Sequence, residues 1–224
     1  MNFSKPFSRI FLILFLLVSI IDILAIIAGS NFWQSISKPL IIPALLAYYL
    51  SVSKVKHTLY IIALFFSFLG DVLLLDKNNL FLYGIGAFLI TQLLYVYIFS
   101  KGLKDSPRSK KVLAFAPFMV FFIVLMSVLR PGLQNFLIPV LIYGMAISVF
   151  GAISLLRFLI KPDKASLSLL SGALLFIMSD SMIALDKFHE HHYFYGIVIM
   201  LTYIMAQFLI AFYMLRSEDQ EEIV

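Results

Sequence analysis

Long apolar runs, separated by short loops that carry most of the charge, dominate this sequence of 224 residues. Hydrophobic residues make up 62% of the chain and charged residues 13%, so the apolar surface exceeds what a soluble domain of this length could bury. A helix needs about 20 residues to cross a hydrocarbon core of about 30 Å. We therefore expect an integral membrane protein of the all-α class, a polytopic membrane helix bundle.

The apolar runs predict a single membrane domain over residues 1–224 with eight transmembrane helices. We expect these helices near residues 7–28, 38–52, 58–75, 80–100, 112–129, 136–159, 167–185 and 193–215, followed by an acidic cytoplasmic tail at 216–224. The first run resembles a signal peptide because Lys5 and Arg9 precede it. However, Asp22 interrupts the run, and no small-x-small cleavage pattern follows it. We therefore keep it as a helix.

Positive residues alternate between the two sides of the predicted membrane domain. Of the 17 Lys and Arg residues, all but four fall in the N-terminal segment, alternate loops and the C-terminal tail; the four exceptions are Lys38, Lys77, Arg130 and Lys187. Because cytoplasmic loops are rich in Lys and Arg, both termini are predicted to lie in the cytoplasm, in a bacterial inner membrane. The net charge of +5 is scattered over these loops and forms no basic face, so it does not indicate nucleic-acid binding.

Two aspartates lie inside apolar runs of similar texture. Asp71 belongs to FFSFLGDVLLL and Asp180 to ALLFIMSDSMIAL. A charged Asp at a helix centre costs about 2.5–3.5 kcal/mol on insertion scales, so a chain that keeps one usually has a function for it. Asp71 and Asp180 are the candidate catalytic pair, although each could instead cap a helix or bond a neighbouring helix. For Asp22, a third carboxylate in an apolar run, a purely structural role and a catalytic role both stay open.

Other polar residues are predicted to surround these carboxylates. In the predicted topology the three aspartates lie in the outer halves of helices that run outward, and the polar stripes of the inward-running helices reach mid-membrane. Together these faces could line one cavity that opens outward. The candidate substrate-binding residues are Asp22, Lys38, Ser67, Tyr83, Gln92, Tyr95, Ser179, Tyr203 and Gln207.

The two halves of the sequence also resemble each other. Asp71 and Gly84 in the first half correspond to Asp180 and Gly196 in the second, and each half has an Asp-Lys pair between these positions. Corresponding helices run in the same direction, which favours a parallel four-plus-four repeat.

Neither a metal site nor a site for an organic cofactor is predicted. The chain has no cysteine, and no GxSxG, P-loop or dinucleotide-binding motif is present. His189, His191 and His192 lie close together with Glu190, but they lack the HExxH spacing. We interpret this group as a hydrated outer loop.

Five motifs, in order along the chain, resemble the YhhN family of lysoplasmalogenase-like membrane proteins. They are Lys38-Pro39-Leu40, Ser67-x-x-Gly70-Asp71, Gly84-x-x-x-Phe88-x-x-x-Gln92-x-x-Tyr95, Gly172-Ala173-x-x-Phe176-x-x-Ser179-Asp180 and Tyr203-x-x-x-Gln207. The resemblance implies cleavage of the vinyl ether bond of a lysoplasmalogen to a fatty aldehyde and a glycerophospho-alcohol, with a lysophospholipid as substrate, membrane lipid as partner and no cofactor. Gln92 departs from the pattern, since the family often has His there, and this puts a proton-transfer role at that position in doubt.

Apart from the resemblance, the presence of two carboxyl groups also favours this chemistry. Vinyl ether hydrolysis needs a neutral acid that protonates carbon and an anion that stabilises the cation formed, a division of roles also found in glycosidases. Two other classes stay open. The same aspartates could relay protons in a small proton-coupled membrane transporter, or the protein could be a lipid-binding membrane protein without catalytic activity.

Overall fold

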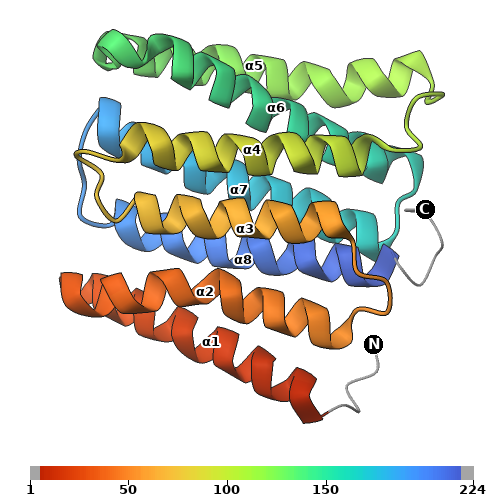
Figure 1. The fold of residues 1–224 in the computed structure, drawn as a ribbon. Helices are drawn as coiled ribbons and strands as arrows, with labels where there is room; N and C mark the ends of the chain where they lie inside the picture. The colour runs from red at the N-terminus through yellow and green to blue at the C-terminus, as the bar shows by residue number, and fades with distance from the viewer. Residues whose placement is uncertain (1–5, 218–224) are drawn as a thin grey trace. The chain divides into compact units, whose positions relative to one another are not determined.

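The computed structural model describes residues 6–217, and within this range the regular structure is helical, which confirms the all-α class. The predicted tail at 216–224 lies outside the described residues from 218 onward. In chain order the helices are α1 (Pro6–Ile27), α2 (Asn31–Val52), α3 (Thr58–Leu73), α4 (Phe81–Ser100), α5 (Arg108–Leu133), the 3-10 helix η1 (Gln134–Phe136), α6 (Leu137–Ile160), α7 (Lys164–Phe188) and α8 (Tyr195–Ser217) (Figure 1).

Six segments of the described chain are long and apolar enough to cross a membrane. They are Phe7–Ile27, Asn31–Val52, Phe81–Ser100, Arg108–Ile160, Lys164–Phe188 and Tyr195–Ser217. The fourth segment has 53 residues and contains α5, η1 and α6, whereas α3, at 16 residues, is shorter than a typical span. The chain is therefore an integral, multi-pass membrane protein. Its predicted eight transmembrane helices and four-plus-four repeat are not confirmed and stay predictions.

Helix α3 ends two residues earlier than predicted because a turn competes with it. The Asp76 carboxylate accepts hydrogen bonds from the backbone N–H groups of Asn78 and Asn79, at 3.2 and 3.1 Å, and from the Asn79 side chain at 2.9 Å. Such local bonds offer the backbone an alternative to the helix. The bonds from the Asn79 side chain and backbone also lower the pKa of the Asp76 carboxyl, which lies in the loop after α3.

Helix α2 begins at Asn31, about two turns before the predicted start at Lys38. The Ser30 side chain caps it by accepting a hydrogen bond from the Trp33 backbone N–H at 3.5 Å. The sequence did not predict this start because Pro39 and Pro43 lie inside the helix, whereas proline usually marks the first turn of a helix or a break in it. Lys38, counted among the loop residues in the charge pattern, is therefore part of a helix.

Two compact units make up the chain, and α4 and α8 each contribute residues to both. Unit 1 contains the chain up to Leu94 together with the segment from Met214, and unit 2 contains Tyr95–Tyr213. The prediction of one membrane domain stays a prediction.

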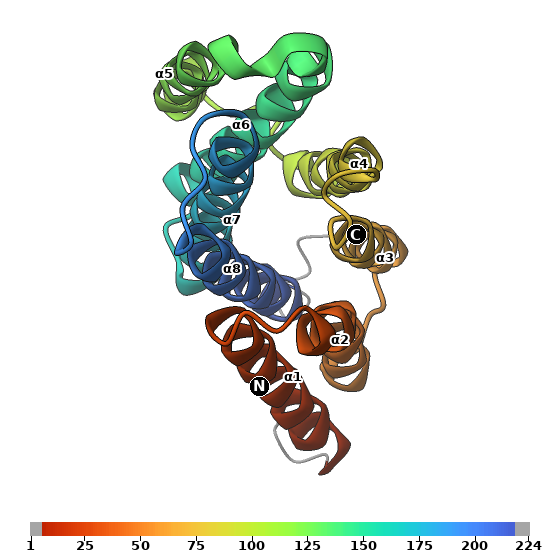
Figure 2. The ribbon, with the colours of Figure 1, turned by 90° about the vertical axis from the view of Figure 1, so that its left-hand side faces the viewer.

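Unit 1 is built from α1, α2, α3 and the first part of α4, with α1 against α2 (Figure 2) and α2 against α3. Helices α3 and α4 approach closely at Gly70, where an added Cβ would lie 2.5 Å from a ring carbon of Phe88. Thr91 of α4 also joins α4 to α3, because it donates a hydrogen bond to the backbone oxygen of Ala63 at 3.1 Å. This packing fixes which face of α3 lies against α4.

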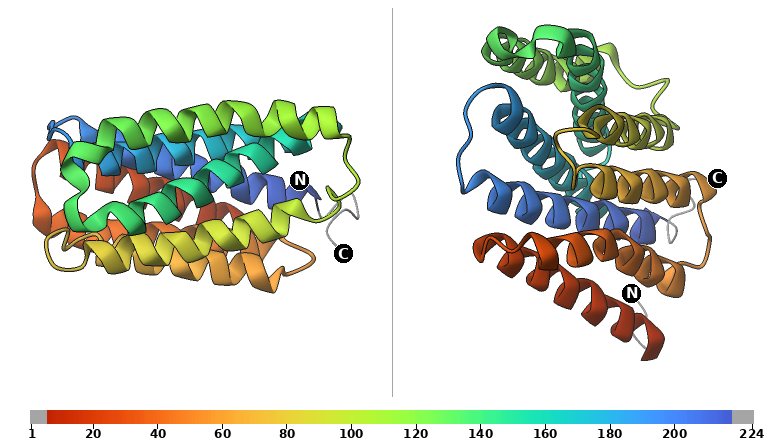
Figure 3. Two further views of the ribbon diagram at one scale, coloured as in Figure 1. Left: turned by 90° about the horizontal axis from the view of Figure 1, so that it is seen from above. Right: turned by 60° about the vertical axis from the view of Figure 1, so that its left-hand side comes forward.

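Unit 2 centres on the α5–α6 hairpin, against which α7 packs (Figure 3). At one end Leu129, Leu133 and Val140 form an apolar cluster, and an added Cβ at Gly132 would lie only 1.8 Å from the backbone oxygen of Phe188. Toward the other end, Tyr95, Phe99, Phe150 and Tyr213 join in aromatic contacts. The close approach of Gly132 to the end of α7 therefore fixes the position of α7 along the α5–α6 hairpin.

Candidate functional site

Asp22 joins α1 to α2 in unit 1. It is fully buried, and its Oδ1 accepts a hydrogen bond from the Ser37 hydroxyl at 2.8 Å. Its Oδ2 is buried with no hydrogen-bond partner among the described residues. The bond to Ser37 is a clear structural role for Asp22, and the second oxygen keeps an acceptor available.

Lys38, the residue after Ser37, brings a positive charge into the same region. Only 7% of its surface is exposed. Its ammonium is attracted most strongly by Asp71, is repelled by Lys77 and is also attracted by Asp22. Unit 1 therefore gathers two carboxyl groups and one amine away from water, where electrostatic interactions are much stronger than at a surface.

Asp71 lies near the end of α3 with 2% of its surface exposed. Ser67, one turn earlier on the same face, donates a hydrogen bond to the Thr91 hydroxyl at 3.2 Å. Next to Thr91, the Gln92 side chain is completely buried, and neither its nitrogen nor its oxygen has a hydrogen-bond partner among the described residues. A buried amide without a partner is rare because leaving each such group unpaired costs about 1–3 kcal/mol.

Asp180 is the corresponding carboxylate of unit 2, on α7, with 8% of its surface exposed. Its Oδ2 accepts a hydrogen bond from the hydroxyl of Tyr143, which α6 supplies. The neighbouring Ser179 donates to the backbone oxygen of Ile199 at 3.1 Å and so holds α7 against α8. Sequence reasoning missed Tyr143, although a polar aromatic residue inside an otherwise apolar run was a usable signal.

Three further predicted residues form a hydrogen-bonded network in unit 2. The Tyr95 hydroxyl donates to Oε1 of Gln207 at 2.9 Å, and Nε2 of Gln207 donates to the Tyr203 hydroxyl at 3.5 Å. The Tyr203 ring packs edge-on against Phe176, with ring centres 5.7 Å apart. These contacts join one polar residue of α4 to two of α8 in a buried network, and their role in substrate binding stays a prediction.

Tyr83 differs from the other predicted site residues because it is exposed. It is 66% exposed, at the start of α4. The next residue, Gly84, faces α3 so closely that an added Cβ would meet the Leu74 side chain at 2.6 Å. Since adjacent residues of a helix point in different directions, Tyr83 is turned outward, and its role in substrate binding stays a prediction.

Residues 6–217 contain no group of three or more His, Cys, Asp and Glu side chains that could hold a metal ion. The histidines after α7 are exposed, and two of them pair with acids: His191 lies 2.6 Å from Asp186, and His192 lies 3.3 Å from Glu190. This agrees with a hydrated loop.

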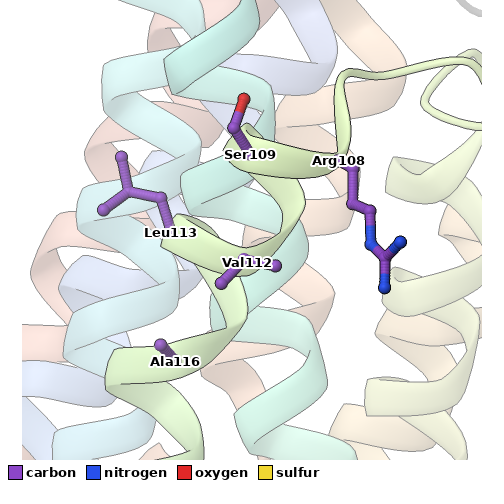
Figure 4. A pocket seen from close by; sticks show the side chains of 5 residues that line it. All are labelled: Arg108, Ser109, Val112, Leu113 and Ala116. Atoms are coloured by element: carbon purple, nitrogen blue, oxygen red, sulfur yellow. The ribbon is translucent and has the colours of Figure 1, made fainter.

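A surface groove runs along the first turns of α5 and contains none of the predicted site residues. Its lining residues all come from this one helix: Arg108, Ser109, Val112, Leu113 and Ala116 (Figure 4). A second, small apolar cavity lies between α5 and α6, at Phe118, Phe122 and Ser148.

Comparison with known proteins agrees with these features. Residues 33–214 match the YhhN family, a range that includes Lys38, Asp71, Asp180 and Gln207 but not Asp22. The chain is similar to lysoplasmalogenase TMEM86B of Rattus norvegicus, with 32% identity over 155 residues, which cover 69% of this chain and 60% of the relative. The chain thus spans about 60% of the length of the curated relative that it matches. No solved structure matches.

Proposed function

Since the chain belongs to the YhhN family, we propose that it is a membrane hydrolase that cleaves the vinyl ether bond of lysoplasmalogen-type lysophospholipids. The products are a fatty aldehyde and a glycerophospho-alcohol. The observation that carries the proposal is the family match over a range that contains two buried aspartates in apolar helices. Intramembrane carboxylates usually mark a functional site.

Asp71 and Asp180 supply the two carboxyl groups in this proposal. One, in its neutral form, delivers a proton to the β-carbon of the alkene, and the other, as an anion, stabilises the oxocarbenium ion that results. Water then adds to the α-carbon and releases a proton to a carboxylate. The hemiacetal formed breaks its carbon–oxygen bond, which yields the aldehyde and leaves the hydroxyl on the glycerol. The acid is regenerated, and one water molecule is consumed in each turnover.

Polar residues of each unit are suited to parts of a lysophospholipid. In unit 1, the buried ammonium of Lys38 can bind a phosphate oxygen, and the Gln92 amide has a donor and an acceptor available for a glycerol hydroxyl. In unit 2, the network of Tyr95, Tyr203 and Gln207 offers further hydroxyl and amide groups. The hydrocarbon chain would lie among the phenylalanines, which number 23 in the sequence.

The predicted topology belongs to the same proposal. With both termini in the cytoplasm of a bacterial cell, reporter fusions at Gly102 and Lys161 should read cytoplasmic, and a fusion at Phe188 should read external. A cytoplasmic reading at Phe188 would reverse the topology and remove the outward-opening cavity.

The deciding experiment is to incubate the purified chain with a lysoplasmalogen and measure aldehyde release. In deuterated water the reaction should be slower, and one deuterium should appear at C2 of the aldehyde, because protonation of carbon is the difficult step. EDTA should not inhibit. A transporter or a lipid-binding protein would release no aldehyde, and aldehyde without deuterium at C2, corrected for exchange of the free aldehyde, would remove the carboxyl groups from the protonation step.

A further inference from the structure

The hydroxyl of Tyr143 is the feature of unit 2 that the family motifs do not contain. Tyr143 lies on α6, half-buried, and donates a hydrogen bond to Oδ2 of Asp180 on α7. A tyrosine hydroxyl within an apolar helix needs a partner, because an unpaired polar group in hydrocarbon costs several kcal/mol. Here that partner is one of the two carboxylates assigned to the reaction.

The backbone around Tyr143 is fixed by packing. The next residue, Gly144, faces α5 so closely that an added Cβ would lie 3.2 Å from a ring carbon of Phe122. Ser148, one turn further on, is buried and donates to the backbone oxygen of Gly144 at 2.7 Å. The tyrosine ring therefore extends from a part of α6 that has little freedom to shift.

The carboxyl group of Asp180, in contrast, is not oriented by its own torsions. The last torsion of an aspartate is broad and roughly two-fold, so an external bond is needed to set the carboxyl plane. The adjacent serines give their hydroxyls to backbone oxygens instead: Ser179 donates to Ile199, and Ser181 donates to Ile177 at 2.6 Å. Tyr143 is a neighbour that donates directly to the carboxyl.

We propose that Tyr143 is a positioning residue, which holds Oδ2 of Asp180 and thereby orients the carboxyl group so that Oδ1 takes part in proton transfer. The inference rests on the proposed function, in which Asp180 is one of the two reacting carboxyl groups. A single hydrogen bond of this kind fixes the direction of the reacting oxygen, and catalysis is sensitive to such misplacement. Tyr143 itself touches neither of the reacting atoms.

The test compares Tyr143→Phe with a matched control, Tyr97→Phe. Tyr97 lies on α4 of the same unit, is 57% exposed, and can lose its hydroxyl without loss of a buried contact. With lysoplasmalogen as substrate, kcat of Tyr143→Phe should fall about tenfold, the equivalent of one hydrogen bond, with little change in KM. Tyr97→Phe should match the wild type in both constants.

Infrared spectroscopy reports the contact itself, without turnover. The difference between wild type and Asp180→Asn identifies the carboxyl bands of Asp180, and these bands should shift in Tyr143→Phe but not in Tyr97→Phe. If Tyr143→Phe does not fold, ring-labelled tyrosine in Asp180→Asn gives the same answer, since the phenol C–O band of one tyrosine should change when its partner is replaced.

The outcomes separate this inference from the proposed function. Unshifted Asp180 bands in folded Tyr143→Phe, or shifted bands with an unchanged kcat, overturn the positioning role while hydrolysis stands. Wild-type protein that releases no aldehyde overturns the proposed function and the positioning role with it, and the infrared bands then decide only whether the Tyr143–Asp180 bond exists.

Discussion

Both units bury an aspartate that interacts with a residue of the preceding helix, but the two partners differ in charge. In unit 1, Asp71 of α3 is attracted by the ammonium of Lys38, which α2 supplies. In unit 2, Asp180 of α7 accepts a hydrogen bond from the neutral phenol of Tyr143, which α6 supplies. A cation favours an ionised carboxylate more strongly than a phenol does. The comparison teaches that similar sequence positions can give two carboxyl groups different surroundings, as a reaction with one acid and one anion requires.

Replacing the aspartates themselves has the largest expected effect. If both units serve one reaction, Asp71→Asn and Asp180→Asn should each lower kcat by about 10²–10⁴-fold, the usual contribution of general acid–base catalysis. The double variant should be little worse than either single one, because residues that act in one step are not additive. Full activity in either folded single variant would break the comparison, since that aspartate would then serve structure alone.

Removing the charge of unit 1 should cost more stability than removing the hydroxyl of unit 2. Lys38→Met removes the positive charge that attracts the two buried carboxyl groups, and a buried charge left without compensation costs more than a lost hydrogen bond. Tyr143→Phe removes one hydrogen bond, worth about 1 kcal/mol. Thermal unfolding in one detergent should therefore show the larger drop in melting temperature for Lys38→Met.

Asp22 provides the control for this difference. Adding Asp22→Asn to Lys38→Met should restore part of the lost stability, because one uncompensated carboxylate is gone. Equal melting temperatures for Lys38→Met and Tyr143→Phe would show that the charge of Lys38 is not held away from water, and the contrast between the units would disappear.

A glycine comparison tests how tightly each unit is packed. Gly132→Ala should destabilise unit 2 by about 1–3 kcal/mol, the typical cost of overpacking, because its Cβ would meet a backbone oxygen that cannot turn away. Gly86→Ala in unit 1 has open space around the new Cβ and should be neutral or slightly stabilising, since alanine is the better helix former. Thermal unfolding of both variants checks the difference; equal effects would mean that α5 and α7 do not meet at Gly132.

The smallest expected effect concerns the starts of the corresponding helices. Asp163 and Ser166 form a capping box on α7, whereas α3 begins after His57 with no side-chain cap. Asp163→Ala should cost about 1 kcal/mol, and His57→Ala should cost less. Helix content and melting temperature measure both, and an equal loss would show that the cap of α7 contributes nothing.

The cap also carries a pH dependence. Burial raises the pKa of the Asp163 carboxyl, but the bonds from Ser166 and the charge of Lys161 outweigh it, so the net pKa lies below the ordinary value of 3.8. The stabilisation is therefore complete above that value and is lost as the pH falls through the lower pKa of the folded protein. Asp163→Asn, which keeps an acceptor oxygen, should lose this pH dependence.

The sequence predicts the helices well because each apolar run is long and bounded by polar residues. Helical spacing also predicts that Tyr203 and Gln207 lie on one face of α8, where a hydrogen bond of 3.5 Å joins their side chains. The start of α2 was wrong because prolines inside a membrane helix resemble those at a helix start.

The partners of the aspartates were harder to predict. Tyr143 carries a hydroxyl inside an apolar helix, but the sequence does not show that this hydroxyl contacts Asp180 on another helix. The Asp22–Ser37 bond joins residues on two different helices, and the choice of Ser37 depends on how α1 and α2 are rotated against each other. Helical period gives the face of a residue on its own helix, but not its neighbour on the next.

The charges on α2 and α3 also bear on how the chain enters the bilayer during synthesis. Lys38 on α2 and Asp71 on α3 would each oppose insertion if their helices entered hydrocarbon alone, at a cost of about 2.5–3.5 kcal/mol for each charge. Because the two charges attract each other in the finished protein, a hairpin of α2 and α3 carries no net charge from this pair. The two helices are thus better suited to leave the translocon together than one after the other, and the short α3, which is poorly suited to insert alone, gains most from the arrangement.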